Sequence, residues 1–260
     1  VDMRSDAFSD CSSLIGPVCL DGLVTIPSSA FKGCSSLSGV SFNSAVSIGE
    51  NAFHGCSSLS SVDFPSTLTS IGASAFRDCS LLLEAKIPNG VTSIGNNSFL
   101  GCTRLELFET PSSLSNLGGA ALQGCTGLKR AVLNGDGTLK LGKSLFRDCS
   151  SLESVVLGEG VASIDDGYYN SGWYSTTYYG MFSNCSSLKS VDIRTKNLKK
   201  LPDYMFLDSS VETVRFAGGV EYVGYEAFYR CASLTSIEGE LKPTIVTNAA
   251  FSGCSKLVGS

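Results

Sequence analysis

Apolar residues recur along the chain at a nearly constant interval. The clearest marker is the motif Ala-Phe-x-x-Cys, which occupies residues 30–34, 52–56, 75–79 and 227–231. The anchor residue of this motif returns every 22 to 24 residues, apart from one step of 36 between Phe146 and Phe182. Its eleven positions are Phe8, Phe31, Phe53, Phe76, Phe99, Leu122, Phe146, Phe182, Phe206, Phe228 and Phe251. A period of this length indicates an array of one repeated supersecondary unit.

Each unit contains two short extended stretches and one turn. After Leu59, the segment Val62-Asp63-Phe64-Pro65 alternates apolar and polar residues, which predicts a strand ended by a proline that cannot continue a ladder. A second extended piece, residues 68–71, stops at a glycine that permits a tight turn. The Ala-Phe-x-x-Cys piece is too short for a helix of several turns, so we expect a helical or 3₁₀ turn there.

One such unit forms only a thin ring and cannot bury its own apolar side chains. Stacking solves this, because equivalent positions of neighbouring coils then lie roughly 5 Å apart and form continuous apolar columns. The pattern therefore predicts a single solenoid over residues 1–260, made of about eleven repeats of ~23 residues.

The repeated run Cys-Ser-Ser-Leu-x-x-Val-x-Phe/Leu/Ile, followed by Val/Leu-Thr-Ser-Ile-Gly-x-x-Ala-Phe, resembles the BspA-like class of leucine-rich repeats over essentially the whole chain. The resemblance implies a right-handed leucine-rich-repeat superhelix with a parallel β-sheet on its concave face. It also implies a secreted or surface-displayed protein that adheres to host extracellular matrix proteins or to other cells. Binding residues are not fixed by the family motif, so the resemblance assigns none here.

The repeat has departures and incomplete ends. Leu122 replaces the anchor Phe, Ser209 replaces the Cys, and residues 164–182 are expanded. Both ends fall inside a unit, whereas repeat arrays normally finish with atypical caps, so we expect the natural protein to be longer at both ends. A signal peptide and an anchor are expected outside these 260 residues.

Composition narrows the function classes. A formal net charge of −5 repels phosphate backbones and anionic lipid, which argues against nucleic acid and membrane surfaces as partners. No apolar run is long enough to cross a bilayer. The single histidine, His54, occupies a position where other coils carry Lys32 or Arg77, so we expect a surface side chain and no site that needs two imidazoles.

Ten of the eleven cysteines share one phase of the repeat. A column spaced along a solenoid does not converge on one point as metal ligands must, so no metal site is expected. Disulfides between neighbouring coils are conceivable, but small buried residues whose thiols bond a neighbouring backbone explain all ten together. Cys19 is out of phase. It is level with Asp63 and is either an exposed reactive thiol or a core residue reached through a register shift at Gly16-Pro17.

The long step between anchors contains an aromatic insertion at residues 166–179. Between Ile164 and Phe182 there are 13 more residues than the usual unit has, and the insertion holds five of the nine tyrosines and the only tryptophan. Tyr and Trp beside Gly, Ser and Asn favour ligand contact, glycan stacking included, whereas a hairpin whose rings cover the adjacent coil is the structural alternative. The candidate ligand-contact residues are Tyr168, Tyr169, Trp173, Tyr174, Tyr178 and Tyr179.

The outward positions of the predicted concave sheet form a second candidate surface. They combine both charges with an apolar centre, although a solvated face would look similar. These residues are Ser41, Asp63, Lys86, Glu109, Val132, Val156, Asp192, Arg215 and Glu238.

Two sequence matches to known ligand-binding motifs are rejected because the surrounding residues do not fit the structure that each motif requires. Residues 137–144 fit the phosphate-loop pattern G-x-x-x-x-G-K-S, but that loop must open a long helix, and the repeat phase places Leu141 in the core and Gly142 in a turn. Residues 134–137 resemble the start of a calcium loop but lack its later carboxylates. We therefore expect no catalytic residues, cofactor or metal.

The leading hypothesis is a non-enzymatic adhesion module that binds a protein or glycan partner across its sheet and through the aromatic insertion. The main rival is a structural spacer that presents another domain. An enzyme has only the rejected phosphate-loop match behind it.

Overall fold

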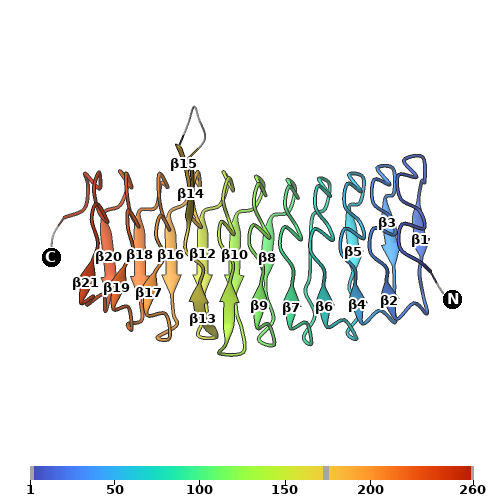
Figure 1. The fold of residues 1–260 in the computed structure, drawn as a ribbon, viewed down its shortest axis with the longest axis horizontal. Coiled ribbons are helices and arrows are strands. Elements are labelled where there is room, and N and C mark those ends of the chain that lie inside the picture. Colours follow the sequence, from blue (N-terminus) through green and yellow to red (C-terminus); the bar gives the residue numbers. More distant parts are fainter. Residues whose placement is uncertain (1–2, 172–175, 259–260) are drawn as a thin grey trace.

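A computed structural model of the protein describes residues 3–171 and 176–258, with the backbone alone for residues 168–171 and 176–178. The coils stack in a row along the long axis of an elongated molecule, with the two ends of the chain at opposite ends of the row (Figure 1). This confirms the predicted solenoid.

Most coils contribute one strand to a first track, whereas the coil at residues 82–87 contributes only a bridge at Glu84. We call this track the strand face. Its members are β1 (Pro17–Cys19), β3 (Gly39–Ser41), β5 (Ser61–Asp63), β8 (Leu107–Glu109), β10 (Arg130–Leu133), β12 (Ser154–Leu157), β16 (Ser190–Ile193), β18 (Thr213–Phe216) and β20 (Ser236–Gly239). All neighbours pair in parallel. They form a three-stranded sheet, β1-β3-β5, and a six-stranded sheet from β8 to β20.

The second extended piece of each coil also forms parallel sheets, which we call the second face. One sheet holds β2 (Thr25–Ile26), β4 (Ser47–Ile48), β6 (Ser70–Ile71), β7 (Ser93–Ile94), β9 (Asn116–Leu117), β11 (Leu139–Leu141) and β13 (Val161–Ile164). A further sheet holds β17 (Lys200–Leu201), β19 (Tyr222–Val223) and β21 (Ile245–Val246). The parallel sheet is therefore not confined to one face, because both extended stretches of a coil pair with their equivalents.

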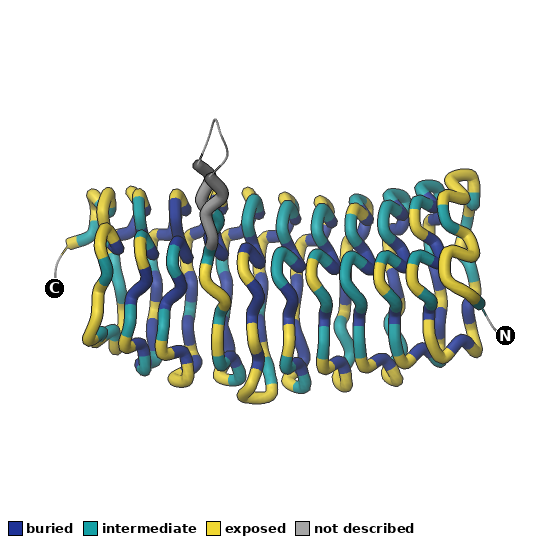
Figure 2. The backbone as a smooth tube through the Cα atoms, in the orientation of Figure 1, coloured by how far each residue is buried: buried dark blue, intermediate teal, exposed yellow. Residues whose placement is uncertain are grey.

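The core runs from coil to coil between these two faces (Figure 2). Its central feature is a column of stacked anchor rings, with centroids 4.7 to 5.6 Å apart, which matches the spacing expected of stacked coils. Leu122 divides this column into two runs of five rings.

The thiol column also has the predicted form. All eleven cysteines are unpaired. From Cys34 to Cys254, each in-phase thiol donates a hydrogen bond of 3.0 to 3.2 Å to the carbonyl oxygen of the anchor residue one coil earlier. Burial raises the pKa of most of these thiols, that of Cys56 and Cys125 to about 12.

The predicted helical or 3₁₀ turn is wrong, since the described residues contain neither conformation. In the second coil, Ser29 and Gly33 have φ of 55° and 74°, and this left-handed pair leaves only three residues between them. The N–H groups of Ser29, Phe31 and Gly33 donate to carbonyls of the next coil, at 2.7 to 2.8 Å. The backbone N–H groups that would form hydrogen bonds within a helix therefore bind the neighbouring coil instead. The anchor segment consists only of separate turns.

Candidate binding surfaces

The strand face brings the predicted outward residues into one row. Ladder partners connect Ser41 to Asp63 at one end and Glu109 to Val132 further along. The same register continues through Val156, Asp192, Arg215 and Glu238. Lys86 lies between the two sheets, two residues after the Glu84 bridge to Leu107, which places it level with Glu109.

The row is polar at its ends and apolar at its centre. Val132 and Val156 are half-buried, whereas Asp63, Lys86, Glu109 and the other charged members, apart from the half-buried Asp192, are exposed. A column of alternating charge runs beside it, with Lys129 paired to Glu106 at 3.1 Å and Lys189 paired to Glu153 at 3.3 Å. Exposed pairs of this kind add little stability, so they define surface charge more than fold.

Cys19 extends the row at its amino-terminal end. It pairs with Ser41 in the β1–β3 ladder and is exposed. Of the two alternatives for this residue, the structure therefore places it outward and not in the core.

The aromatic insertion forms an antiparallel hairpin, β14 (Tyr168–Ser171) and β15 (Thr176–Tyr179), in which Tyr168 faces Tyr179 and Tyr169 faces Tyr178. It leaves the solenoid at the edge where the anchor turns lie (Figure 1). Trp173 and Tyr174 lie outside the described residues. Tyr179 is half-buried, and the guanidinium of Arg147 lies 3.8 Å from its ring centroid, so this ring packs against the solenoid.

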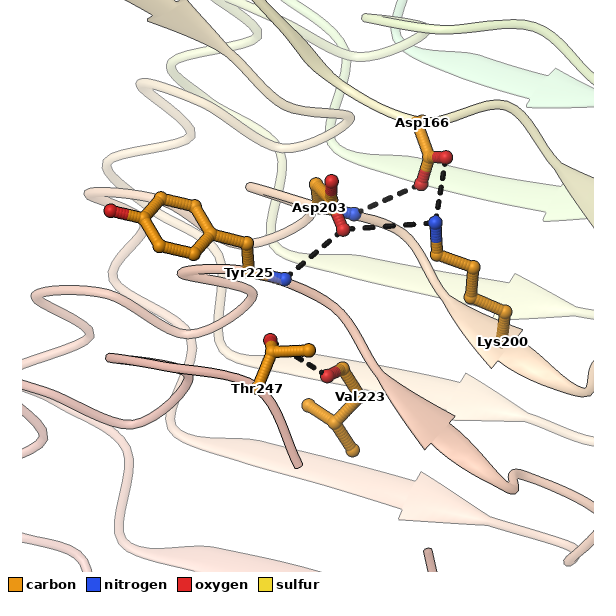
Figure 3. Close-up of polar contacts among 6 residues, drawn as sticks. All are labelled: Asp166, Lys200, Asp203, Val223, Tyr225 and Thr247. Carbon is orange, nitrogen blue, oxygen red and sulfur yellow. Dashed lines mark hydrogen bonds and ion pairs between the residues drawn. The ribbon is translucent and has the colours of Figure 1, made fainter. Parts of the chain in front are cut away.

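The base of the hairpin is fixed to the following coil. Asp166 accepts a hydrogen bond of 3.2 Å from the Asp203 N–H and pairs with the Lys200 ammonium at 2.7 Å (Figure 3). Asp203 repeats this arrangement one coil later, since its carboxylate accepts the Tyr225 N–H at 3.0 Å. A Cβ on Gly180 would overlap the Tyr204 carbonyl, so the return strand requires glycine at its end.

The two rejected motifs lie in ordinary parts of the repeat. Leu139 and Leu141 of the phosphate-loop match are buried residues of strand β11, and no helix follows. In the loop before it, the Thr138 hydroxyl and N–H donate to Asp136 at 2.8 and 2.7 Å, which lowers the pKa of that carboxyl. Across residues 3–171 and 176–258 we find no cluster of three metal-ligating side chains, and no helix long and apolar enough to span a membrane.

One surface feature escaped the sequence analysis. Leu83 and Leu107, 43% and 45% exposed, occupy outward positions of neighbouring coils beside the strand-face row. Leu83 corresponds to Ser60 of the preceding coil, whereas Leu107 corresponds to Glu84 of the preceding coil and to Ser61 one coil before that. Comparing outward positions between repeats would have found them, because leucine breaks a polar column there.

Comparison with known proteins agrees with this architecture. The model of the family described as "BspA type Leucine rich repeat region (6 copies)" matches residues 1–129, 82–177 and 174–258. The crystal structure of the T. pallidum leucine-rich repeat protein TpLRR is 30% identical, with a TM-score of 0.51, and the match covers 57% of this chain and 72% of that one. No curated protein matches the sequence significantly.

Two further solved structures match most of the chain at lower TM-scores. A leucine-rich repeat protein from Bacteroides ovatus is 25% identical over 97% of this chain and 80% of that chain, with a TM-score of 0.49. A leucine-rich cell surface protein from Faecalibacterium prausnitzii is 20% identical over 98% of this chain and 81% of that chain, also with a TM-score of 0.49.

Proposed function

The chain belongs to the family of BspA-type leucine-rich-repeat proteins, and on that premise we propose that it is a non-enzymatic protein-binding module of a cell-surface or secreted protein. Members of this family are generally surface proteins. The proposed role is adhesion to host extracellular matrix proteins or to other cells. The strand face is the proposed contact surface, and the hairpin β14–β15 is a second one.

The observation that carries this proposal is the continuous row of outward residues on the strand face. From Ser41 to Glu238 it crosses eight coil-to-coil intervals, or about 38 Å at the usual strand spacing. A stable protein interface buries roughly 800 Å² on each partner, equivalent to a patch about 28 Å across. The row is thus long enough for one partner, and its apolar centre with a charged rim resembles the organisation of protein interfaces.

The test is binding of the purified chain to immobilised fibronectin, fibrinogen, laminin and collagen, and to a glycan array. The strand-face variant is Val132→Lys with Val156→Lys, because lysine occupies the same outward position at Lys86. Its matched control is Thr25→Lys with Ser163→Lys, which adds the same charge at exposed positions of the second face. We expect the strand-face variant to bind at least tenfold more weakly and the control to bind normally.

A second variant addresses the hairpin. Replacing residues 165–181 by Gly-Ala-Ser-Ala, the sequence of residues 72–75, restores the ordinary unit length between Ile164 and Phe182. Loss of glycan binding in this variant alone would assign a glycan to the hairpin. If the native chain binds none of these proteins or glycans, the adhesion proposal fails and the spacer hypothesis takes its place.

A further inference from the structure

The strand face is interrupted at one coil. The three-stranded sheet ends at β5 and the six-stranded sheet begins at β8. The coil between them, residues 82–87, forms no strand and joins its neighbour through a single bridge, Glu84 to Leu107. The row of outward residues is therefore continuous in register, but its backbone departs from the regular ladder at this point.

A groove of about 570 Å³ lies at the interruption. It runs between residues 83–87 of one coil and residues 106–109 of the next. Ala85 lies in the groove, whereas the inward residues of the adjoining strands are Val62 and Phe108. The volume of the groove is within the range of ligand-binding clefts.

The groove is bordered by exposed aliphatic side chains. Leu83 contributes from one coil and Leu107 from the other. Leu83 lies where the preceding coil has Ser60, and Leu107 lies where the preceding coil has Glu84, so the stacking of the coils does not require an apolar side chain at either position. Two such residues on either side of a groove instead offer apolar area that a bound side chain would remove from water.

The charge around the groove is negative. Glu84 is paired with Lys86 at 2.9 Å, and Glu106 is paired with Lys129 at 3.1 Å. Within the described ranges, Glu109 has no cation at ion-pair distance, although it also borders the groove. The side chains that line the groove thus hold three carboxylates and one ammonium, which favours a cationic ligand.

We propose that this groove binds an extended peptide segment of a partner protein, with an aliphatic or aromatic side chain between Leu83 and Leu107 and a Lys or Arg beside Glu109. The residues that line the groove belong to two neighbouring stretches, 83–87 and 106–109, and an extended chain can lie between such stretches. A second copy of this chain is disfavoured as occupant, because its net charge of −5 would bring two acidic surfaces together. The inference rests on the proposed protein-binding function and names the partner chemistry at one place on the same face.

The probe is an array of eight-residue peptides in a Ser/Gln background. Each has one Leu, Phe or Trp and one Lys or Arg two residues later, so that both side chains lie on the same side of an extended chain. Counterparts carry Glu in place of the cation or Ser in place of the apolar residue. We expect the chain to bind the apolar and cationic peptides at least tenfold more strongly than either counterpart.

Three variants locate the binding. Leu83→Ser with Leu107→Ser introduces the serines that an earlier coil carries at these two repeat positions, Ser60 and Ser61, and should weaken binding of the selected peptides at least tenfold. Glu109→Gln should weaken it about threefold at low salt and less at high salt, because exposed charges are screened. Val46→Ser, which removes an exposed apolar residue from beside the second face, is the control and should change nothing.

The proposal is overturned if the acidic counterparts bind equally well or if the selected peptides bind the Leu83/Leu107 variant undiminished. Concentration-dependent self-association of the chain that the same variant abolishes would also overturn it, in favour of a second copy. The variant is measured on the matrix-protein panel as well. If a matrix protein binds the native chain and the variant equally, the proposed function stands and the groove is excluded as its binding site. If the selected peptides bind but no matrix protein does, the groove stands and the proposed adhesion function fails.

Discussion

Replacing Ser98 by alanine should stabilise the protein. Ser98 directly precedes the anchor Phe99, is fully buried, and its hydroxyl has no hydrogen-bond partner among the described residues. The equivalent residues one coil before and one coil after are Ala75 and Ala121, both also fully buried. The backbone ladder at this position uses the Ser98 carbonyl, which accepts the Phe76 N–H at 2.8 Å and is unaffected by the substitution.

The size of the effect follows from the cost of burying a hydroxyl without a partner, roughly 1–3 kcal/mol in proteins. Alanine removes that cost and loses only the packing of one oxygen atom, so we expect Ser98→Ala to raise the free energy of unfolding by about 1–2 kcal/mol. For a chain of this size, a gain of 1 kcal/mol corresponds to a rise of roughly 2–4 °C in Tm.

Urea unfolding followed by circular dichroism measures this difference, provided that the m-value is unchanged. The neighbouring coil offers the reverse experiment. Ala75→Ser introduces the same hydroxyl into the same environment and should lower the free energy of unfolding by a similar amount. Equal stability of Ser98→Ala and the native protein, or a loss, would refute the reasoning, since it would mean that the hydroxyl is satisfied or that the coils are not equivalent.

Three further predictions address the stacking of the coils and the exposure of the thiols. Burial raises the pKa of Cys125 to about 12, above the unfolded value of about 8.5, so stability present below pH 8.5 should be lost as the pH rises towards 12. Urea unfolding at pH 8 and pH 10.5 should show the loss, and Cys125→Ala should reduce it. Gly95→Ala should lower the free energy of unfolding by more than about 2 kcal/mol in the same assay, because the added Cβ would lie 2.5 Å from the Ala73 nitrogen. Gly39→Ala is the control and should be nearly neutral, because its Cβ would meet only an ordinary contact at 3.5 Å. A thiol reagent should label the exposed Cys19 in the native protein at once and Cys125 only after unfolding, as mass spectrometry of the labelled peptides would show.

Positions that repeat in every coil could be predicted from the sequence. The register of Asp63 with its equivalents, the stacking of the anchor rings and the bonding of the thiols all follow from one period, because identical units can share a core only when identical residues coincide. The position of the insertion could be predicted as well, since 13 extra residues must leave a coil whose length otherwise varies by only two residues, but its hairpin form is only one of the alternatives that the sequence allows.

Features that depend on contacts between coils could not be predicted. The anchor turn is not helical because Ser29 and Gly33 adopt positive φ and the N–H groups point to the next coil. A sequence does not reveal that a serine adopts positive φ, and the length of the motif alone favoured a helical turn. The pairing of both extended stretches has the same origin, since single-sequence periodicity identifies strands but not how many faces of a coil they occupy.

Stacking also restricts where a solenoid can acquire a binding site. Close contact between coils leaves no room for a larger side chain at some positions, as Gly95 shows against Ala73 of the preceding coil, and ladder positions must keep their backbone bonds. Outward residues and insertions are the places where one coil can differ from the next without disturbing either neighbour. Leu107, in a column that otherwise carries residues such as Ser61 and Arg130, is such a difference, and so is the hairpin. In this protein, departures from the repeat are therefore better guides to binding than the repeat itself, because the repeated residues are already committed to holding the coils together.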